Sequence, residues 1–282
     1  MGLYHWSLVL VAVVALCLVL FGATHTAVSA APDTFKDCDV CPEMVVIPAG
    51  QFVMGSPSYE EGRYDREGPQ HPVMIGQPFA VGKYEIMFRE WDACVADGGC
   101  DGYRPDDEGW GRGDRPVISV SWEHAQTYLG WLSRTTGTAY RLLSEAEWEY
   151  TARAGTTTPF HFGATIGTDQ ANYDGHYFTY GDGRKGVDRR KTVPVGSFPS
   201  NAFGLHDVHG NVWEWVEDCW NDSYAGAPGD GDAWTAGECG RRVIRGGSFD
   251  VTPKNVRAAY RGWGGTIGRD YDGGFRVART LP

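Results

Sequence analysis

Residues Gly204–Trp215 read GLHDVHGNVWEW, and this stretch is the most informative part of the chain for its fold. A Gly-Asn turn stands between two acidic residues and is followed by two tryptophans, a pattern typical of an irregular loop pinned by aromatic side chains. Two further short stretches follow it, Arg242–Phe249 (RVIRGGSF) and Gly274–Arg279 (GFRVAR). Their order and spacing carry more information than any one of them alone.

The composition agrees with a loop-rich fold. The chain has 282 residues, with 39 glycines and 11 tryptophans, and it contains no internal repeat or low-complexity segment. Its length is enough for one large domain or two small ones with a full core. The formal net charge is −11, and because nucleic-acid binding depends on clustered Lys and Arg, we expect no nucleic-acid partner.

Three segments have apolar residues at helical spacing: Met87–Cys94, Ser121–Thr136 and Ser144–Ala154. In the second, Ser119 or Ser121 can cap the start and Gly137 marks the end. In the third, Ser144 and Glu147 form a capping-box pattern. No convincing helix is predicted after Gly155.

Strand signals are short. Met44–Ser56 is interrupted by Pro48-Ala49-Gly50 and is predicted to form a hairpin, and Val73–Tyr84 contains strand-like pieces around Pro78. The best strand candidates near the C-terminus are Arg241–Ile244, Val256–Tyr260 and Phe275–Arg279. A few helices followed by a loop-rich β region predict an α+β fold with short strands.

Residues 1–30 are predicted to be a secretory signal peptide. The apolar run Leu8–Phe21 is short for a membrane span, and Val28 and Ala30 fit the small-residue positions of a cleavage site. The region before the run lacks Lys and Arg, so an uncleaved membrane anchor is the alternative. We expect an exported protein that is periplasmic, on the cell surface or secreted, with no membrane span after cleavage.

Seven cysteines are present, and Cys17 lies in the apolar run. The remaining six form an even set, which in an exported protein indicates disulfides. Loop lengths favour pairing Cys94 with Cys100 and Cys219 with Cys239. Cys38 and Cys41 form a C-x-x-C in the linker 31–43, where a small structural disulfide is favoured over a redox or metal site.

The stretches quoted above, together with MVVIPAGQFVMGS (44–56), RPVISVSWEHA (115–125) and RLLSEAEWEYTARAG (141–155), resemble the formylglycine-generating enzyme family, also called the sulfatase-modifying factor family. The resemblance covers about residues 44–279, so we expect residues 44–282 to form a domain of this type. It implies a formylglycine-generating-enzyme-like variant of the C-type lectin fold, with few helices and many loops.

The same resemblance reveals a departure. Oxidases of this family bind copper through two cysteines, and those positions are Val251 and Val256 here. Valine cannot ligate copper as a thiolate does, so no copper is expected and the usual mechanism cannot operate. Whether the chain is an enzyme stays open, and the sequence favours a protein that is not one.

The resemblance implies structural Ca²⁺ at two loop sites. For the first, the matching residues are Asp207, Gly210, Val212 and Glu214; for the second they are Asn172, Tyr173 and, with an offset in spacing, Asp188 and Arg190. A mixture of carboxylate, amide and carbonyl oxygens suits Ca²⁺. The alternative for the first site is that Asp207 caps the turn and Glu214 pairs with an arginine. His206 and His209 are expected to be surface histidines rather than metal ligands.

A non-enzymatic branch with the same lectin-like scaffold, the variable proteins of diversity-generating retroelements, displays ligand-binding side chains between an RGGS-like string and GFR. Here that segment is 248–274, and aromatic, acidic and basic side chains alternate in it as in a binding surface. The candidate ligand-binding residues are Ser248, Asp250, Thr252, Tyr260, Trp263, Arg269, Asp270 and Tyr271.

The sequence therefore favours an exported scaffold that binds an unidentified protein or small molecule through residues 248–274. The alternatives are a formylglycine-generating-type oxidase, or a periplasmic maturation enzyme acting without the cysteine pair, since some periplasmic relatives act in siderophore maturation. A third hypothesis is an accessory envelope protein that binds no ligand.

Overall fold

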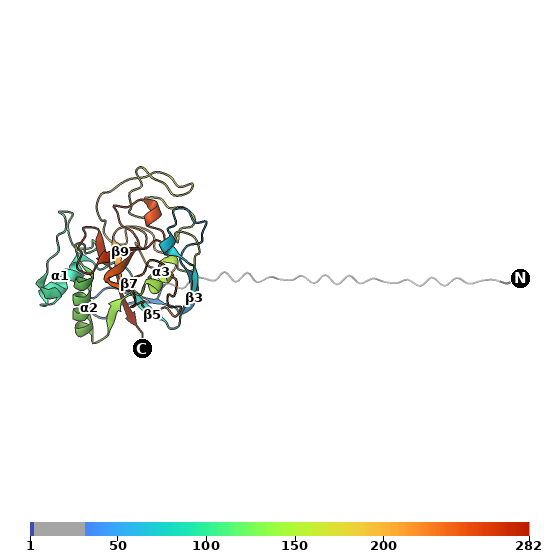
Figure 1. The fold of residues 1–282 in the computed structure, drawn as a ribbon. Helices are drawn as coiled ribbons and strands as arrows, with labels where there is room; N and C mark the ends of the chain where they lie inside the picture. Colours follow the sequence, from blue (N-terminus) through green and yellow to red (C-terminus); the bar gives the residue numbers. More distant parts are fainter. Residues whose placement is uncertain (3–31, 282) are drawn as a thin grey trace. The chain divides into compact units, whose positions relative to one another are not determined.

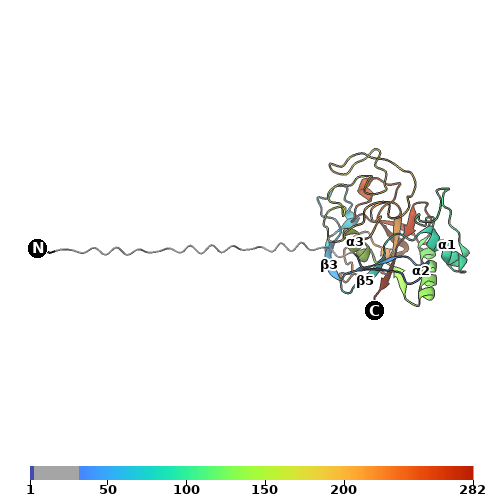
Figure 2. The same cartoon turned by 180° about the vertical axis from the view of Figure 1, so that it is seen from behind.

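Three α-helices and eleven short strands are the main regular elements of the described residues. The structure is a computed structural model that describes residues 1–2 and 32–281, so the predicted signal peptide lies almost wholly outside the described residues. The helices are α1 (Phe88–Ala96), α2 (Trp122–Thr136) and α3 (Glu145–Arg153). In both views α1 and α2 lie at one edge of the domain and β3 lies at the opposite edge (Figures 1 and 2).

The helix predictions are confirmed, and the capping residues explain why. The Ser121 hydroxyl accepts the N–H of His124 at the start of α2, and Gly137 ends the helix with a φ of 70°, which glycine adopts without strain. Ser144 and Glu147 form the predicted capping box of α3. Trp148 and Ala152 of α3 are buried, as their spacing predicts.

Eleven strands form three sheets in the described residues. The five-stranded sheet has the order β1 (Thr34–Phe35), β2 (Met44–Ile47), β5 (Phe79–Gly82), β11 (Val277–Thr280), β6 (Tyr140–Leu142). The four-stranded sheet has the order β10 (Gly273–Phe275), β7 (Trp213–Trp220), β8 (Glu238–Arg245), β9 (Gly262–Gly265), and β3 (Gly50–Met54) pairs with β4 (His71–Ile75). Short 3₁₀ turns lie at Asp65–Glu67, Cys100–Gly102 and Pro253–Asn255.

Two strand predictions are wrong. β2 and β3 do not form a hairpin, because β2 pairs with β1 and β5 while β3 pairs with β4. Because β1 and β5 occupy both edges of β2, no edge of β2 is left to pair with β3. The segment Val256–Tyr260 is not a strand but an irregular stretch: Val256, Ala258 and Ala259 are buried, yet Arg257 turns away to bind carboxylates.

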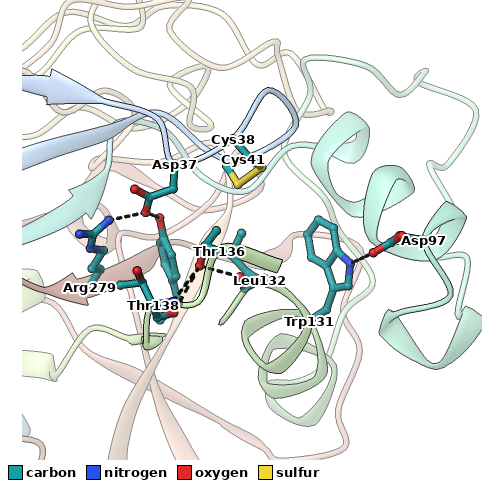
Figure 3. Close-up of a disulfide and its surroundings, with 10 residues drawn as sticks. Asp37, Cys38, Cys41, Asp97, Trp131, Leu132, Thr136, Thr138 and Arg279 are labelled. Carbon is teal, nitrogen blue, oxygen red and sulfur yellow. Dashed lines mark hydrogen bonds and ion pairs between the residues drawn. A yellow bond between two sulfur atoms is a disulfide. The ribbon is translucent and has the colours of Figure 1, made fainter. Parts of the chain in front are cut away.

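All three predicted disulfides are confirmed: Cys38–Cys41, Cys94–Cys100 and Cys219–Cys239. Cys38–Cys41 lies on the loop between β1 and β2 (Figure 3). Beside it, Asp37 contacts both the Tyr140 hydroxyl and the Arg279 guanidinium. These bonds fix the N-terminal segment to β6 and β11.

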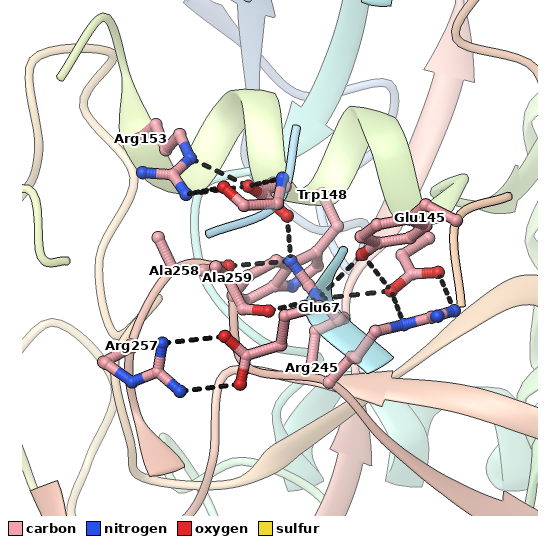
Figure 4. A network of polar contacts seen from close by, with 12 residues as sticks. Glu67, Glu145, Trp148, Arg153, Arg245, Arg257, Ala258 and Ala259 are labelled. Carbon is pink, nitrogen blue, oxygen red and sulfur yellow. Dashed lines mark hydrogen bonds and ion pairs between the residues drawn. The ribbon is translucent and has the colours of Figure 1, made fainter. Parts of the chain in front are cut away.

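A buried network of ion pairs joins α3 to the C-terminal loops (Figure 4). Arg245 contacts Glu149 at 2.6 Å, and Arg261 contacts Glu145 at 2.8 and 2.6 Å. Arg257 contacts Glu67 at 2.8 and 2.7 Å. Each of these arginine side chains is fully buried, so each charge requires its partner. The network holds the otherwise irregular segment 245–261 in place.

Candidate functional site

The two positions that carry cysteine in the oxidases lie together in an apolar cluster. Val256 is fully buried and Val251 packs against the same cluster, which also contains Phe160, Tyr173 and Tyr180. Within the described residues, every cysteine is in a disulfide, so this part of the chain holds no free thiol for a soft metal.

His209 lies directly beside this cluster and is buried, so the expectation of a surface histidine is wrong for it. Its Nδ1 is 2.7 Å from the Val256 carbonyl, and its Nε2 accepts the N–H of His161 at 3.1 Å. Burial lowers the pKa of His209 well below its ordinary value and lowers that of His161 to about 4. His206 is half-buried, and its Nδ1 faces the Phe198 carbonyl instead. The rings of His209 and His206 therefore hydrogen-bond to the backbone of different loops.

The residues of the first predicted Ca²⁺ site gather in a buried acidic region. One oxygen of Asp207 accepts the Gly196 N–H at 2.7 Å, while Oδ1 is buried without a hydrogen-bond partner among the described residues. Glu85, which the sequence analysis did not single out, is buried nearby. Burial, with the charge of Asp207, raises the pKa of Glu85 well above its ordinary value, and burial raises that of Asp207 to about 6.

Glu214 is already paired. Its carboxylate contacts Arg276 through Nε at 3.2 and 3.1 Å and through Nη2 at 2.8 Å, and it accepts the Trp148 indole N–H at 2.8 Å. The structure thus shows the arginine pairing that stood as the alternative to metal binding. Of the three carboxyl groups in this region, Arg276 contacts that of Glu214 alone, and burial raises the pKa values of Glu85 and Asp207 more than the charge of Arg276 lowers them.

The second predicted site lies against the first. Gly210 pairs with Asn172, and a Cβ at Gly210 would stand 2.2 Å from the Asn172 carbonyl, so only glycine permits this approach. The Asn172 side chain donates to Asn211 at 3.2 Å and to the Lys191 carbonyl at 3.0 Å. Its Oδ1 is buried without a partner in the described part of the chain.

The other residues of the second predicted Ca²⁺ site, Tyr173, Asp188 and Arg190, are placed less favourably for binding a cation. Tyr173 is buried, and its hydroxyl donates to the Ile166 carbonyl. Asp188 accepts from the backbone and side chain of Arg190, both at 2.9 Å, within a partly exposed turn. No three His, Cys, Asp or Glu side chains converge on one point in residues 32–281. The expected sets combine carboxylates with carbonyls and amides, and each contains one buried oxygen without a hydrogen-bond partner among the described residues, Asp207 Oδ1 in the first and Asn172 Oδ1 in the second.

The segment 248–274 divides into a buried frame and an exposed surface. Ser248 is fully buried, where its hydroxyl donates to Asp272 at 2.6 Å, so it supports the loop from inside. Asp250, Trp263, Arg269, Asp270 and Tyr271 are exposed, and Thr252 and Tyr260 are half-buried.

Four of these side chains gather on one patch together with two aromatic residues from an earlier loop. Tyr271 donates its hydroxyl to Asp250, and this bond raises the pKa of Tyr271 to about 12. Arg269 lies over the ring of Tyr103 at 5.5 Å, and the Ser119 N–H fixes the Asp270 carbonyl at 3.1 Å. We call the set Tyr103, Trp110, Asp250, Arg269, Asp270 and Tyr271 the acidic aromatic patch.

Buried Phe249 supports this patch from below. Its ring is 5.2 Å from that of Trp110 and 5.9 Å from that of Tyr271. The sequence analysis missed Tyr103 and Trp110 because they lie about 140 residues before the rest of the patch. Their only signal was an aromatic residue in each of two Asp- and Gly-rich turns.

Tyr260 and Trp263 lie outside the patch. Tyr260 packs against Tyr64 and Trp213 and accepts a bond from Arg66 at 3.0 Å. Trp263 stands on the edge strand β9, with the Arg241 guanidinium 4.0 Å from its ring centre. Thr252 bonds Asn255 and shapes the neighbouring turn. The structure therefore brings together half of the eight predicted ligand-binding residues.

Comparison with known proteins agrees with this architecture. Residues 30–281 match the family described as the sulfatase-modifying factor enzyme 1-like domain, and the chain belongs to that family. A solved structure of PvdO from Pseudomonas aeruginosa is 42% identical, with a TM-score of 0.76, and the match covers 89% of this chain and all of that one.

Two further proteins are similar to this chain at lower identity than PvdO. The formylglycine-generating enzyme of Thermomonospora curvata is 28% identical over 270 residues, covering 75% of this chain and 84% of that protein. Treponema denticola variable protein 1 is 21% identical with a TM-score of 0.67, covering 89% of this chain and all of that one. The last match shows the shared C-type-lectin-like fold alone.

Proposed function

We propose that this chain is an exported ligand-binding member of the sulfatase-modifying factor family, and that its ligand contacts the acidic aromatic patch. The observation that carries the proposal is the way the patch is built. Exposed residues of the 248–274 segment and the half-buried rings of Tyr103 and Trp110 meet over a buried support, Phe249 and the Ser248–Asp272 bond. Rigid aromatics with adaptable polar neighbours are typical of binding surfaces.

The charges of the patch define the ligand class. Asp250, Asp270 and Asp272 lie close enough that the charges of Asp250 and Asp270 raise the pKa of Asp272, although burial is the larger cause. Arg269 is the one cation of the patch, and it lies over Tyr103. Two carboxylates against one arginine, beside the exposed Tyr271 ring and the half-buried rings of Tyr103 and Trp110, favour a ligand that carries both an aromatic group and a positive charge.

Copper chemistry of the oxidase type is not part of the proposal. Val251 and Val256 fill the two thiolate positions with apolar side chains, and the six cysteines of the described residues are disulfide-bonded. The disulfides are also compatible with export. No helix of the described residues is long and apolar enough to cross a membrane.

Ca²⁺ at the two loop sites is a further part of the proposal. The first ion would be held by Asp207, Gly210 and Val212, and Glu214 would contribute only if it turns away from Arg276. The second ion would be held by Asn172, Tyr173 and the 188–190 turn. Ca²⁺ would supply positive charge to a region in which three carboxyl groups face one arginine. Its role would be structural, since Asp207, Glu214 and Asn172 are buried and none of the candidate ligands belongs to the patch.

The test of the proposal uses two small probes with opposite charge. A tyrosyl-arginine dipeptide and a tyrosyl-glutamate dipeptide are compared by ligand-observed NMR with the wild-type chain and with Asp250→Asn/Tyr271→Ala. We expect the basic dipeptide to bind the wild type preferentially and to lose at least about tenfold in affinity with the variant. Tyr59→Ala, an exposed tyrosine elsewhere, is the matched control and retains binding.

A second candidate is a maturation enzyme that works without the cysteine pair. The observation that favours it is the 42% identity to PvdO over nearly the whole chain, which goes beyond a shared fold. Expression of this chain in a P. aeruginosa strain lacking PvdO tests it. Restoration of the lost function by the wild type, but not by the patch variant, would make the patch a site of processing as well as binding.

A further inference from the structure

The Cys38–Cys41 disulfide lies beside a cavity with charged walls. Cys38 is partly exposed, whereas Cys41 is buried and lines a cavity of about 160 Å³. The same cavity is lined by Lys36, Arg89 and Glu90. Cys38 is thus the more accessible cysteine of the pair, and Cys41 borders a partly open cavity with charged walls.

Glu90 is the unusual member of this cavity. It is buried on α1, where Oε2 accepts the Met87 N–H at 2.9 Å, while Oε1 has no hydrogen-bond partner within residues 32–281. Its pKa is raised to about 7, mainly by burial. At neutral pH the carboxyl group thus holds a proton for a substantial fraction of the time.

We propose that Cys38–Cys41 is a redox-active disulfide that accepts electrons from a dithiol reductant, with Glu90 as the proton donor to the leaving sulfur. This activity is separate from ligand binding at the acidic aromatic patch. It rests on the partial exposure of Cys38, the burial of Cys41 and the carboxyl group that shares the Cys41 cavity.

The reductant passes two electrons to the protein in two thiol–disulfide exchange steps. A thiolate of the reductant attacks the Cys38 sulfur, the Cys38–Cys41 bond breaks, and Cys41 leaves as a thiolate into the cavity, where it takes the Glu90 proton. The second thiol of the reductant then attacks the mixed disulfide and releases Cys38, which takes a proton from water. The protein gains two electrons and two protons, the reductant becomes a disulfide, and solvent reprotonates Glu90.

The surroundings favour this chemistry. Lys36 and Arg89 line the cavity that receives the departing thiolate, and positive charge stabilises a thiolate. Asp39 lines the same cavity and Arg89 is paired with Asp114, so Lys36 supplies most of this stabilisation. The loop can open without unfolding the domain, because β1 pairs with β2 and Asp37 contacts Tyr140 and Arg279 independently of the disulfide. Figure 3 shows these contacts beside the two sulfurs.

Cys219–Cys239 is a matched internal control. It too joins a buried cysteine, Cys219, to a partly exposed one, Cys239. The protein with all three disulfides is treated with dithiothreitol, quenched in acid, and analysed by differential alkylation and mass spectrometry, with near-UV circular dichroism as the test of folding. We expect Cys38–Cys41 to be reduced at least about tenfold faster than Cys219–Cys239 while the fold persists. Equal rates, or reduction only on unfolding, would overturn the proposal.

The role of Glu90 is tested in the same assay with Glu90→Gln, which keeps the cap to Met87. We expect slower reduction of Cys38–Cys41 at pH 6–7 and loss of an inflection near pH 7 in its rate profile, with no change at Cys219–Cys239. Asp39→Asn, an exposed change on the same cavity, should leave the profile unaltered. An unchanged profile in Glu90→Gln would remove Glu90 from the mechanism.

Discussion

Arg276 donates to both carboxylate oxygens of Glu214, and both side chains are about 1% exposed. The pair joins β7 to the segment between β10 and β11, and Arg276 also donates to the carbonyls of Gly82 and His206. One buried guanidinium therefore holds four segments of the chain together. Because the Glu214–Arg276 pair also lies at the predicted Ca²⁺ sites, substitutions in this region test both the stability of the fold and metal binding.

Removal of the Glu214 charge should be costly. In Glu214→Gln the buried Arg276 loses its paired anion, and we expect the free energy of unfolding to fall by about 3 kcal/mol in urea titrations. Glu238→Gln is the control, because its pair with Arg241 is exposed and should contribute less than about 1 kcal/mol. A similar loss in both variants would contradict the assigned role of the buried pair.

Ca²⁺ should stabilise the native protein. An ion that binds only the native state raises the melting temperature by mass action, so millimolar Ca²⁺ should raise it relative to chelator in differential scanning calorimetry. Asp207→Asn should abolish most of this shift because it alters the orphaned Oδ1 and its charge. The exposed Asp101→Asn should keep it. Identical melting of the wild type with Ca²⁺ and with chelator would contradict the metal proposal.

Stability should depend on pH through Glu90. Its pKa of about 7 in the native state is above the ordinary 4.5, so the native state binds the proton more tightly than the unfolded state does. The free energy of unfolding should therefore fall as pH rises from about 4.5 to 7, by at most about 3 kcal/mol for this group.

The variant Glu90→Gln isolates that contribution. It removes the titration while keeping the acceptor for the Met87 N–H, so urea unfolding between pH 4.5 and 7.5 should show a smaller decrease in stability than the wild type. A parallel pH dependence in the two proteins would mean that other groups are responsible.

Copper should not support oxidation by the wild-type chain. A Cys-x-Pro-x-Arg peptide incubated aerobically with the protein and copper should keep its thiol mass, because Val251 and Val256 provide no thiolate. Val251→Cys/Val256→Cys should instead gain Cu(I) affinity, measured by competition with a chromogenic chelator. Peptide conversion by the wild type under metal-repletion controls would show that the mechanism does not need the cysteine pair.

Local signals made several features predictable. The cap at Ser121, the capping box at Ser144 and the stop at Gly137 are determined by neighbours within a few residues, so the helix limits follow from the sequence. The disulfides follow from short loops. Family resemblance supplied the fold.

Long-range partners were not predictable in this way. β2 pairs with β5 rather than with its neighbour β3, a choice made by tertiary contacts. The acidic aromatic patch needs Tyr103 and Trp110, whose approach to Tyr271 depends on how distant loops pack over Phe249. The burial of Ser248 and His209 likewise follows from the tertiary structure and not from a local pattern.

The measurement that tests the central proposal most directly is the affinity of the tyrosyl-arginine dipeptide for the wild type and for Asp250→Asn/Tyr271→Ala. Ligand binding at the acidic aromatic patch predicts saturable binding to the wild type, weaker binding of the tyrosyl-glutamate dipeptide, and at least about a tenfold loss in the variant. Equal affinity of the two proteins, or no preference for the basic dipeptide, would contradict it.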